Sequence, residues 1–316
     1  MVFLGTLAGC RPPSLLITPV SGRHDLVETE LSRDSFLATT KIALIDVTGV
    51  ILNAPQPQLL STGEHPVSYL LEQLDKARRD RQVKGVLLRI NSPGGSVVAS
   101  ELMHEEIQRF KKSGKPIVAV LMDVAASGGY YIACACDEIV AQPSTVTGSI
   151  GVIMQMLDVS KTLELIGVKA EAITSGDFKD AGSPLRSLRP EERAVFQAIV
   201  NDMYGRFVAV VAAGRKSLDE ARVRTLADGR VYTASQALEH KLIDRIASLH
   251  DAVDGLKEKL GTPRIRLVTY HRRHDYRPNY YAAAPSTGDI NLLKTELPGA
   301  FPTWTPRFMY LWLPGR

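Results

Sequence analysis

Alternation between strand-like and helix-like patterns, which begins near Lys41, restricts the fold more than any other feature of the sequence. Three continuous apolar runs have the length of buried strands, at residues 42–47, 85–90 and 116–121. Helical patterns follow them, at residues 66–80, 96–112 and 127–135. Strands joined through helices in this way lie parallel, with right-handed crossovers. We therefore predict an α/β fold, a twisted parallel sheet with helices packed around it.

The second half of the chain is dominated by helical patterns, at residues 190–213, 218–226, 234–240 and 251–260. The composition, 45% apolar and 23% charged, is that of a soluble globular protein. No apolar run approaches the ~20 residues that cross a bilayer as a helix, so the sequence predicts no transmembrane helix. Cys134 and Cys136 are expected to be small buried hydrophobes rather than a disulfide.

Charge is unevenly distributed along the chain. The net charge is +4, but residues 264–316 hold eight Lys and Arg against three acids, a local excess of +5. The rest of the chain is close to neutral, so we expect no nucleic-acid partner. We divide the chain into a leader and linker at residues 1–40, a catalytic domain at 41–262 and a basic, proline-rich arm at 263–316.

The N-terminal leader contains a possible lipidation site. Leu7-Ala8-Gly9-Cys10 resembles the lipobox of bacterial lipoproteins, in which the cysteine is acylated after cleavage. No Lys or Arg precedes the apolar run, and the run is short for a signal sequence, so a chance match is the alternative. A lipidated Cys10 would attach the protein to a membrane on its extracytoplasmic side.

Two glycine-rich loops follow predicted strands and open helices. The first is Asn91-Ser-Pro-Gly94-Gly95-Ser96, and the second is Ala125-Ala-Ser127-Gly128-Gly-Tyr-Tyr131. Carboxyl ends of neighbouring parallel strands lie together, so amides of Gly128 and of Gly94 or Gly95 are expected around one point beside the Ser127 hydroxyl. That arrangement is an oxyanion hole with its nucleophile. A tight turn and a serine that only caps its helix are the alternatives.

A nucleophilic serine needs a base, and the histidines of this chain are poorly placed to supply one. None lies between Ser127 and His240, and His104 falls within a predicted helix. Lysine is the other choice, because a buried, neutral amine accepts a proton. Lys179 lies among small residues in Ser175-Gly-Asp-Phe-Lys179-Asp-Ala-Gly-Ser-Pro184 and is the candidate; a lysine in a loop is otherwise solvated.

These segments, with Thr147-Gly-Ser149-Ile-Gly-Val152, resemble the motifs of the signal peptide peptidase A family in its short form, in the same order. The similarity runs from about residue 41 to residue 260. It implies the Clp protease and crotonase fold, Ser127 as nucleophile, Lys179 as general base and Ser149 as the group that orients the lysine. It also implies that Gly128, with Gly94 or Gly95, forms the oxyanion hole.

The resemblance extends to partners. It implies a serine endopeptidase that degrades hydrophobic remnants of signal peptides at a membrane surface, without a cofactor or metal. It also implies a ring- or dome-shaped homo-oligomer in which adjacent subunits can share each active site. Short-form members carry a transmembrane anchor near the N-terminus, where this chain has only the possible lipobox.

Three other functions fit the sequence less well. A Clp-like protease needs a histidine about 25 residues after the serine, where this chain has Val152. A crotonase-type acyl-CoA enzyme does not need Ser127 together with Lys179, and an inactive membrane scaffold needs neither. Tyr130 and Tyr131 are either core residues or the lining of a substrate pocket.

Overall fold

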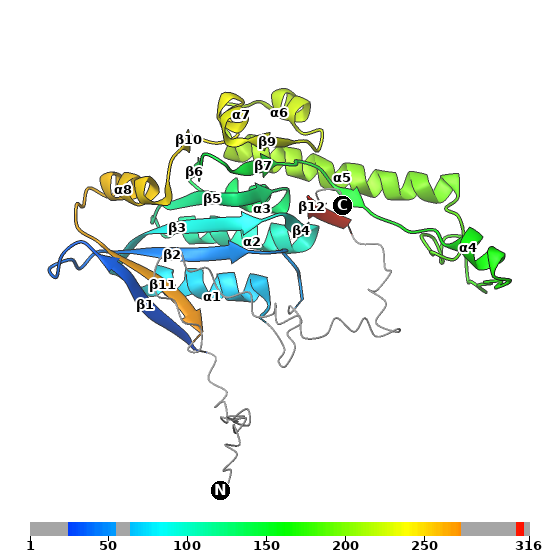
Figure 1. The fold of residues 1–316 in the computed structure, drawn as a ribbon, viewed down its shortest axis with the longest axis horizontal. Coiled ribbons are helices and arrows are strands. Elements are labelled where there is room, and N and C mark those ends of the chain that lie inside the picture. Colours follow the sequence, from blue (N-terminus) through cyan, green and yellow to red (C-terminus); the bar gives the residue numbers. More distant parts are fainter. Residues whose placement is uncertain (1–24, 55–63, 273–307, 313–316) are drawn as a thin grey trace, which may run out of the picture.

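A nine-stranded, mostly parallel sheet forms the centre of the molecule in the computed structural model, which describes residues 25–54, 64–272 and 308–312 (Figure 1). Its strands are β1 (Leu26–Arg33), β2 (Lys41–Thr48), β3 (Val83–Ser92), β5 (Ile117–Ala126), β6 (Glu138–Ala141), β7 (Val146–Gly148), β9 (Val231–Thr233), β10 (Arg245–Ile246) and β11 (Arg266–Arg272). The main order is β1-β11-β2-β3-β5-β6-β10, with β7 beside β5 and β9 beside β7. Only β1 with β11 and β7 with β9 pair antiparallel among these strands. The predicted α/β fold with a parallel sheet is confirmed.

Helices cover both faces of the sheet. They are α1 (Pro66–Arg79), α2 (Val97–Lys111), α3 (Gly128–Ala133), α4 (Ser160–Leu165), α5 (Pro190–Gly214), α6 (Glu220–Leu226), α7 (Ala234–Glu239) and α8 (Leu249–Lys259). Alternate residues of a strand face opposite sides. On β2, Ala43 and Ile45 pack in the core with α1, α2 and α3, whereas Ile42 and Leu44 pack with α8. This two-sided burial explains why the strands read as continuous apolar runs.

A small second sheet and one projecting segment lie outside the central sheet and its helices. A small second sheet consists of β4 (Gly94–Ser96), β12 (Phe308–Leu311) and β8 (Ile153–Met154), with β12 in the middle. After β8 the chain leaves the body, forms α4 and returns through α5 (Figure 1). We call residues 155–189 the arm.

Helix α5 is long and apolar enough to cross a membrane by length and composition alone, the only such helix among the described residues. The sequence predicted none, because charged residues interrupt this segment. Only 17% of the most apolar 18-residue stretch of α5 is buried. The buried residues near its C-terminal end, Phe207, Val208 and Val211, join the core of the body.

The structure corrects the expected limits of the catalytic domain. Strand β1 lies in the range assigned to the linker, and β11 lies in the range assigned to the basic arm, yet both belong to the central sheet. Strand β1 is mixed in composition because it is an edge strand with no buried residue, and β11 is short and bounded by arginines. Cys10 and most of the basic arm lie outside the described residues.

Candidate active site

Ser127 occupies the sharp turn between β5 and α3. Its backbone has φ 52° and ψ −117°, a conformation that residues other than glycine rarely adopt. The turn is held by two hydrogen bonds, from Ser127 N to the Gly148 carbonyl oxygen at 2.7 Å and from Tyr131 N to the Ser127 carbonyl oxygen at 2.8 Å. The Ser127 side chain makes no capping hydrogen bond to α3. Its role is therefore not that of a helix cap, and such strain at a small polar residue is typical of functional sites.

The two glycine loops meet at this turn. The Gly128 amide nitrogen lies 2.6 Å from the position that a Cβ on Gly94 would take, and the Gly95 nitrogen lies 3.2 Å from the corresponding position on Gly128. A side chain at any of the three residues would collide with backbone or with Ser100. The glycines are therefore required for the close approach of the two loops.

The amides of this cluster are not equivalent. The Gly94 N–H donates to the Ser92 hydroxyl oxygen at 3.1 Å, and that hydroxyl donates to the Gly49 carbonyl oxygen at 2.6 Å. The Gly94 amide is thus engaged inside its own loop. Gly95 and Gly128 are left as the pair of amides able to stabilise an oxyanion.

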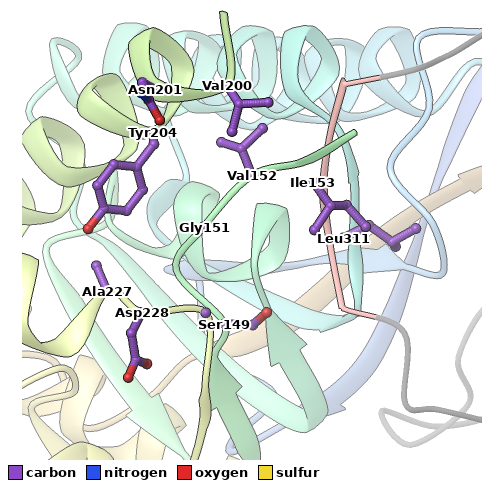
Figure 2. Close-up of a pocket in the computed structure, with 11 residues that line it drawn as sticks. Ser149, Gly151, Val152, Ile153, Val200, Asn201, Tyr204, Ala227, Asp228 and Leu311 are labelled. Carbon is purple, nitrogen blue, oxygen red and sulfur yellow. The ribbon is translucent and has the colours of Figure 1, made fainter. Parts of the chain in front are cut away.

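Ser149 directly follows β7, the strand that pairs with β5. Strand β7 pairs with β5 so that Gly148 is opposite Ala126, which places Ser149 level with Ser127. Ser149 also has a positive φ, 48°, and its N–H donates to the Arg230 carbonyl oxygen at 2.8 Å. Figure 2 shows Ser149 at the edge of a cavity of about 300 Å³, between α5 and Leu311 of β12.

Lys179 does not reach Ser127 within the chain. It lies on the arm, its side chain is exposed, and among the described residues its ammonium takes part in no ion pair. Figure 1 shows the arm at the far end of α5, away from the turn between β5 and α3. The chain therefore places Ser127, Ser149 and the glycines together and leaves Lys179 apart.

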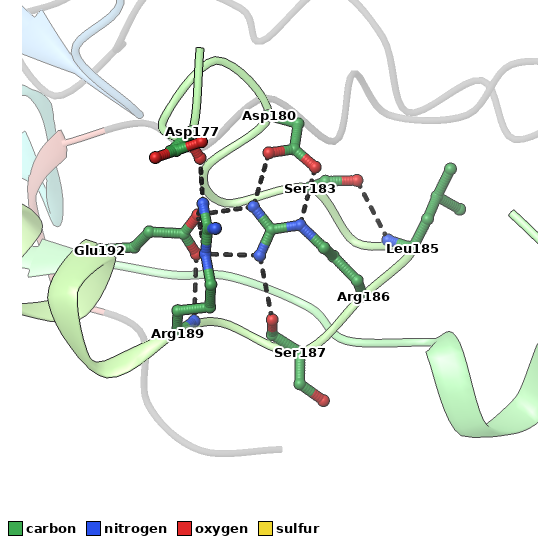
Figure 3. Close-up of polar contacts among 8 residues, drawn as sticks. All are labelled: Asp177, Asp180, Ser183, Leu185, Arg186, Ser187, Arg189 and Glu192. Carbon is green, nitrogen blue, oxygen red and sulfur yellow. Dashed lines mark hydrogen bonds and ion pairs between the residues drawn. The ribbon is translucent and has the colours of Figure 1, made fainter. Parts of the chain in front are cut away.

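An ion-pair network gives the Lys179 segment a defined conformation (Figure 3). The Arg186 guanidinium lies between the Asp180 and Glu192 carboxylates, with N–O distances of 2.6 and 2.5 Å. Arg189 contacts the same Glu192 and donates to the Asp177 carbonyl oxygen. Hydrogen bonds from Arg186, then from Arg189, hold the pKa of the Glu192 carboxyl well below its ordinary value. Lys179 is thus flanked by Asp177 and Asp180, both tied to the start of α5.

Glu192 was not predicted from the sequence, although a signal was present. Arg189-Pro190-Glu191-Glu192 places proline at the first helical position and glutamate at the third, which is the pattern of a capped helix start. The Glu192 carboxylate indeed accepts from the Arg189 N–H at 3.0 Å. Nothing in this pattern indicates the added contact with Arg186.

The tyrosines after Ser127 have different surroundings. Tyr130 is fully buried, and its hydroxyl donates to the Leu242 carbonyl oxygen, so it is a core residue. The Tyr131 ring instead stacks on Tyr310 of β12, with ring centroids 5.1 Å apart. The His104 ring makes an edge contact with the Tyr131 ring, with centroids 5.3 Å apart, and burial lowers the His104 pKa to about 4.

Comparison with known proteins adds to this geometry. Residues 109–262 match Peptidase family S49. The chain is 41% identical to signal peptide peptidase SppA of Enterococcus faecium over 249 residues, which are 79% of this chain and 72% of that protein. The chain belongs to the signal peptide peptidase A family. As a member of this family it is a serine peptidase, and the acyl-CoA enzyme and the inactive scaffold are set aside.

Longer proteins share the same region. The chain is 35% identical to the chloroplastic serine protease SPPA of Arabidopsis thaliana over 230 residues, 72% of this chain and 34% of that protein. It is 34% identical to Protease 4 of Haemophilus influenzae over 214 residues, 68% of this chain and 34% of that protein. This signal peptide peptidase A member thus matches about a third of each longer relative.

Proposed function

We propose that this peptidase is an endopeptidase for membrane-associated peptides, such as cleaved signal peptides, and that Ser127 and Lys179 from two copies of the chain form its catalytic dyad. The observation that carries the proposal is the separation of a strained, uncapped Ser127 from an exposed Lys179 on the arm. A second copy that brings its Lys179 to Ser127 completes a site that one chain leaves unfinished.

The surface of the arm supports association with a second copy. Several of its apolar side chains are exposed, including Leu165 at 87% and Ile166 at 69%. Exposed apolar groups gathered on one projecting segment are typical of protein interfaces. Ser149 lines the cavity described above, and we assign this cavity to the incoming Lys179 segment of the neighbour.

The reaction follows from these groups. Ser127 Oγ attacks the carbonyl carbon of the scissile peptide bond, and its proton passes to the neutral Nζ of the neighbour's Lys179. Amides of Gly95 and Gly128 stabilise the negative oxygen that develops. The lysine then returns the proton to the leaving amine, the C–N bond breaks, and an ester to Ser127 remains. Water, activated by the same lysine, hydrolyses the ester, while Ser149 orients the amine.

Location at a membrane is part of the proposal. The names of the relatives associate this family with signal peptides, and those are apolar sequences that leave the membrane poorly. Acylation of Cys10 would hold the enzyme on the extracytoplasmic side, and two acyl chains are enough for stable anchoring.

Mixing two inactive variants tests the shared site. Ser127→Ala and Lys179→Ala should each abolish hydrolysis of a fluorogenic peptide. In co-assembled 1:1 oligomers, about a quarter of the interfaces pair an intact Ser127 with an intact Lys179, so about a quarter of the wild-type activity should return. Mixed oligomers that stay inactive would show that each chain supplies both residues. Co-assembly is checked with two different affinity tags.

A further inference from the structure

The arm has no packing of its own to hold its shape. None of residues 155–189, all of which the structure describes, is buried. The backbone hydrogen bonds around Lys179 are local, such as the one from Lys179 N to the Gly176 carbonyl oxygen at 3.0 Å. A segment without buried apolar contacts opens easily. The position of Lys179 therefore depends on polar contacts between the arm and the start of α5.

Those contacts begin at one buried carboxylate. The Glu192 side chain is fully buried in the first turn of α5, although Glu191 and Arg193 on either side of it are exposed. Its carboxylate accepts from the Arg189 backbone N–H at 3.0 Å and from the guanidinium groups of Arg186 and Arg189. A buried charge needs such partners to replace its water. The start of α5 thus anchors both arginines.

Arg186 links this carboxylate to the residue beside Lys179 (Figure 3). One edge of the Arg186 guanidinium donates to Glu192, at 2.9 and 2.5 Å, and another edge donates to Asp180, at 2.7 and 2.6 Å. Two bidentate contacts fix both the position and the orientation of a guanidinium, and a single ammonium does not form them. Asp180 directly follows Lys179, so one side chain ties the lysine to the buried Glu192.

Arg189 restrains the chain on the other side of Lys179. Its guanidinium donates to the Asp177 carbonyl oxygen and lies over the Phe178 ring, 5.9 Å from the ring centroid. The residues before and after Lys179 are therefore held by two arginines that share one anchor. Lys179 itself stays exposed between them.

We propose that Arg186 and Glu192 are positioning residues for catalysis, which hold Lys179 at the place where Ser127 of a neighbouring copy meets it. This inference rests on the proposed function. The alternative is an ion pair that only stabilises the fold or the assembly, and its effect would not depend on which copy carries it. A positioning role acts only in the copy that supplies the lysine.

Arg186→Met in an otherwise unchanged chain gives the first test. Its kcat for a fluorogenic peptide should fall by ~100-fold, because displacement of a catalytic group by about 1 Å has an effect of that size. KM should change by less than about twofold, since neither residue lies among those around Ser127. Glu192→Gln should act in the same way. An unchanged kcat would overturn the proposal.

Arg193→Met is the matched control. It removes the same charge from the residue next to Glu192, where the side chain is exposed and, among the residues that the structure describes, takes part in no ion pair. This variant should keep the kcat of the wild type. A loss as large as that of Arg186→Met would show a general effect of charge and would overturn the proposal.

Mixed oligomers show which copy needs the network. Arg186→Met is added either to Ser127→Ala chains, which supply the lysine, or to Lys179→Ala chains, which supply the serine. Each double variant is then mixed 1:1 with the other single variant. The first mixture should lose ~100-fold of the activity that the two single variants regain together, and the second should keep it within about twofold. Both mixtures carry the substitution in half of their chains, so a defect of folding or assembly would lower both alike.

Failure of this inference and failure of the proposed function give different results. If the two single variants regain activity when mixed, but Arg186→Met lowers it equally in both mixtures or in neither, the positioning role is refuted and the shared dyad stands. If the two single variants stay inactive together while the wild type is active, the shared dyad is refuted, and the inference with it.

Discussion

Replacement of Ser127 by glycine should stabilise the protein while it removes activity. A non-glycine residue in a sparsely populated conformation such as that of Ser127 costs ~1–3 kcal/mol. Glycine relieves this strain but gives the unfolded chain more freedom, which costs about 0.4–1 kcal/mol. Ser127→Gly should therefore exceed Ser127→Ala in free energy of unfolding by about 0.5–2 kcal/mol, equivalent to ~1–8 °C in Tm. Both variants lose the hydroxyl, so peptide hydrolysis should fall more than ~1000-fold in each.

Urea unfolding followed by circular dichroism gives the comparison, at one fixed chain concentration because self-association adds to apparent stability. Gly205, inside α5, is the matched control, since nothing lies within 4 Å of the Cβ that alanine would add there. Gly205→Ala should raise the free energy of unfolding by about 0.5–1 kcal/mol. Alanine should therefore be the more stabilising residue at position 205, and glycine at position 127. Equal or greater stability of Ser127→Ala over Ser127→Gly would refute the strained turn.

Further predictions concern the base, its orientation, the arm and the membrane. Lys179→Arg should be as inactive as Lys179→Ala in a peptide assay, because a guanidinium does not accept the Ser127 proton; substantial activity would exclude the dyad. Ser149→Ala should lower kcat by ~10–100-fold without abolishing it, since orientation is lost and the base stays. Hydrogen bonds from Ser160 and then Ser187 lower the pKa of Asp158 to about 2. The depressed pKa of Asp158 stabilises the arm above the ordinary carboxyl pKa of about 4, and this stabilisation is lost as pH falls through about 2. Pepsin should therefore cut the arm faster at pH ~2 than at pH ~4 when each rate is divided by its rate on an unstructured reference peptide at the same pH; an unchanged ratio would count against this contribution. Cys10→Ala should move the protein from the membrane to the soluble fraction in a bacterial host, and a wild-type protein that is already soluble would exclude lipidation.

The sequence predicts the middle of the central sheet, because β2, β3 and β5 each carry their own apolar signal. Residues 42–47, 85–90 and 116–121 are apolar on both faces, as strands covered by helices on both sides must be. Strand β1 has no buried residue, so its sequence contains no comparable apolar run. The position of β12 depends on pairing with strands more than 150 residues away, and no local pattern specifies such a partner.

The candidate site, like the fold, is only partly predictable from the sequence. Ser127, Gly95 and Gly128 come together through strand order and loop composition, which are legible in the sequence. The choice of Gly95 over Gly94 depends on one hydrogen bond, from the Gly94 N–H to Ser92 Oγ, that only the structure reveals. The proposed approach of Lys179 to Ser127 would depend on contacts between copies of the chain, which a single sequence does not describe.

Helix α5 has a mechanical consequence for the assembly proposed above. Its aliphatic and aromatic anchors, Phe207, Val208 and Val211, lie near one end, and the Lys179 segment is tied to the other end through Glu192. From Phe207 to Pro190 the helix spans about 25 Å at 1.5 Å per residue, so a tilt of ~5° would sweep its far end through ~2 Å. Misplacement by about 1 Å is enough to slow an enzyme ~100-fold. In the proposed assembly, the turnover number at each serine would therefore depend on the stiffness of a helix that belongs to the neighbouring copy of the chain.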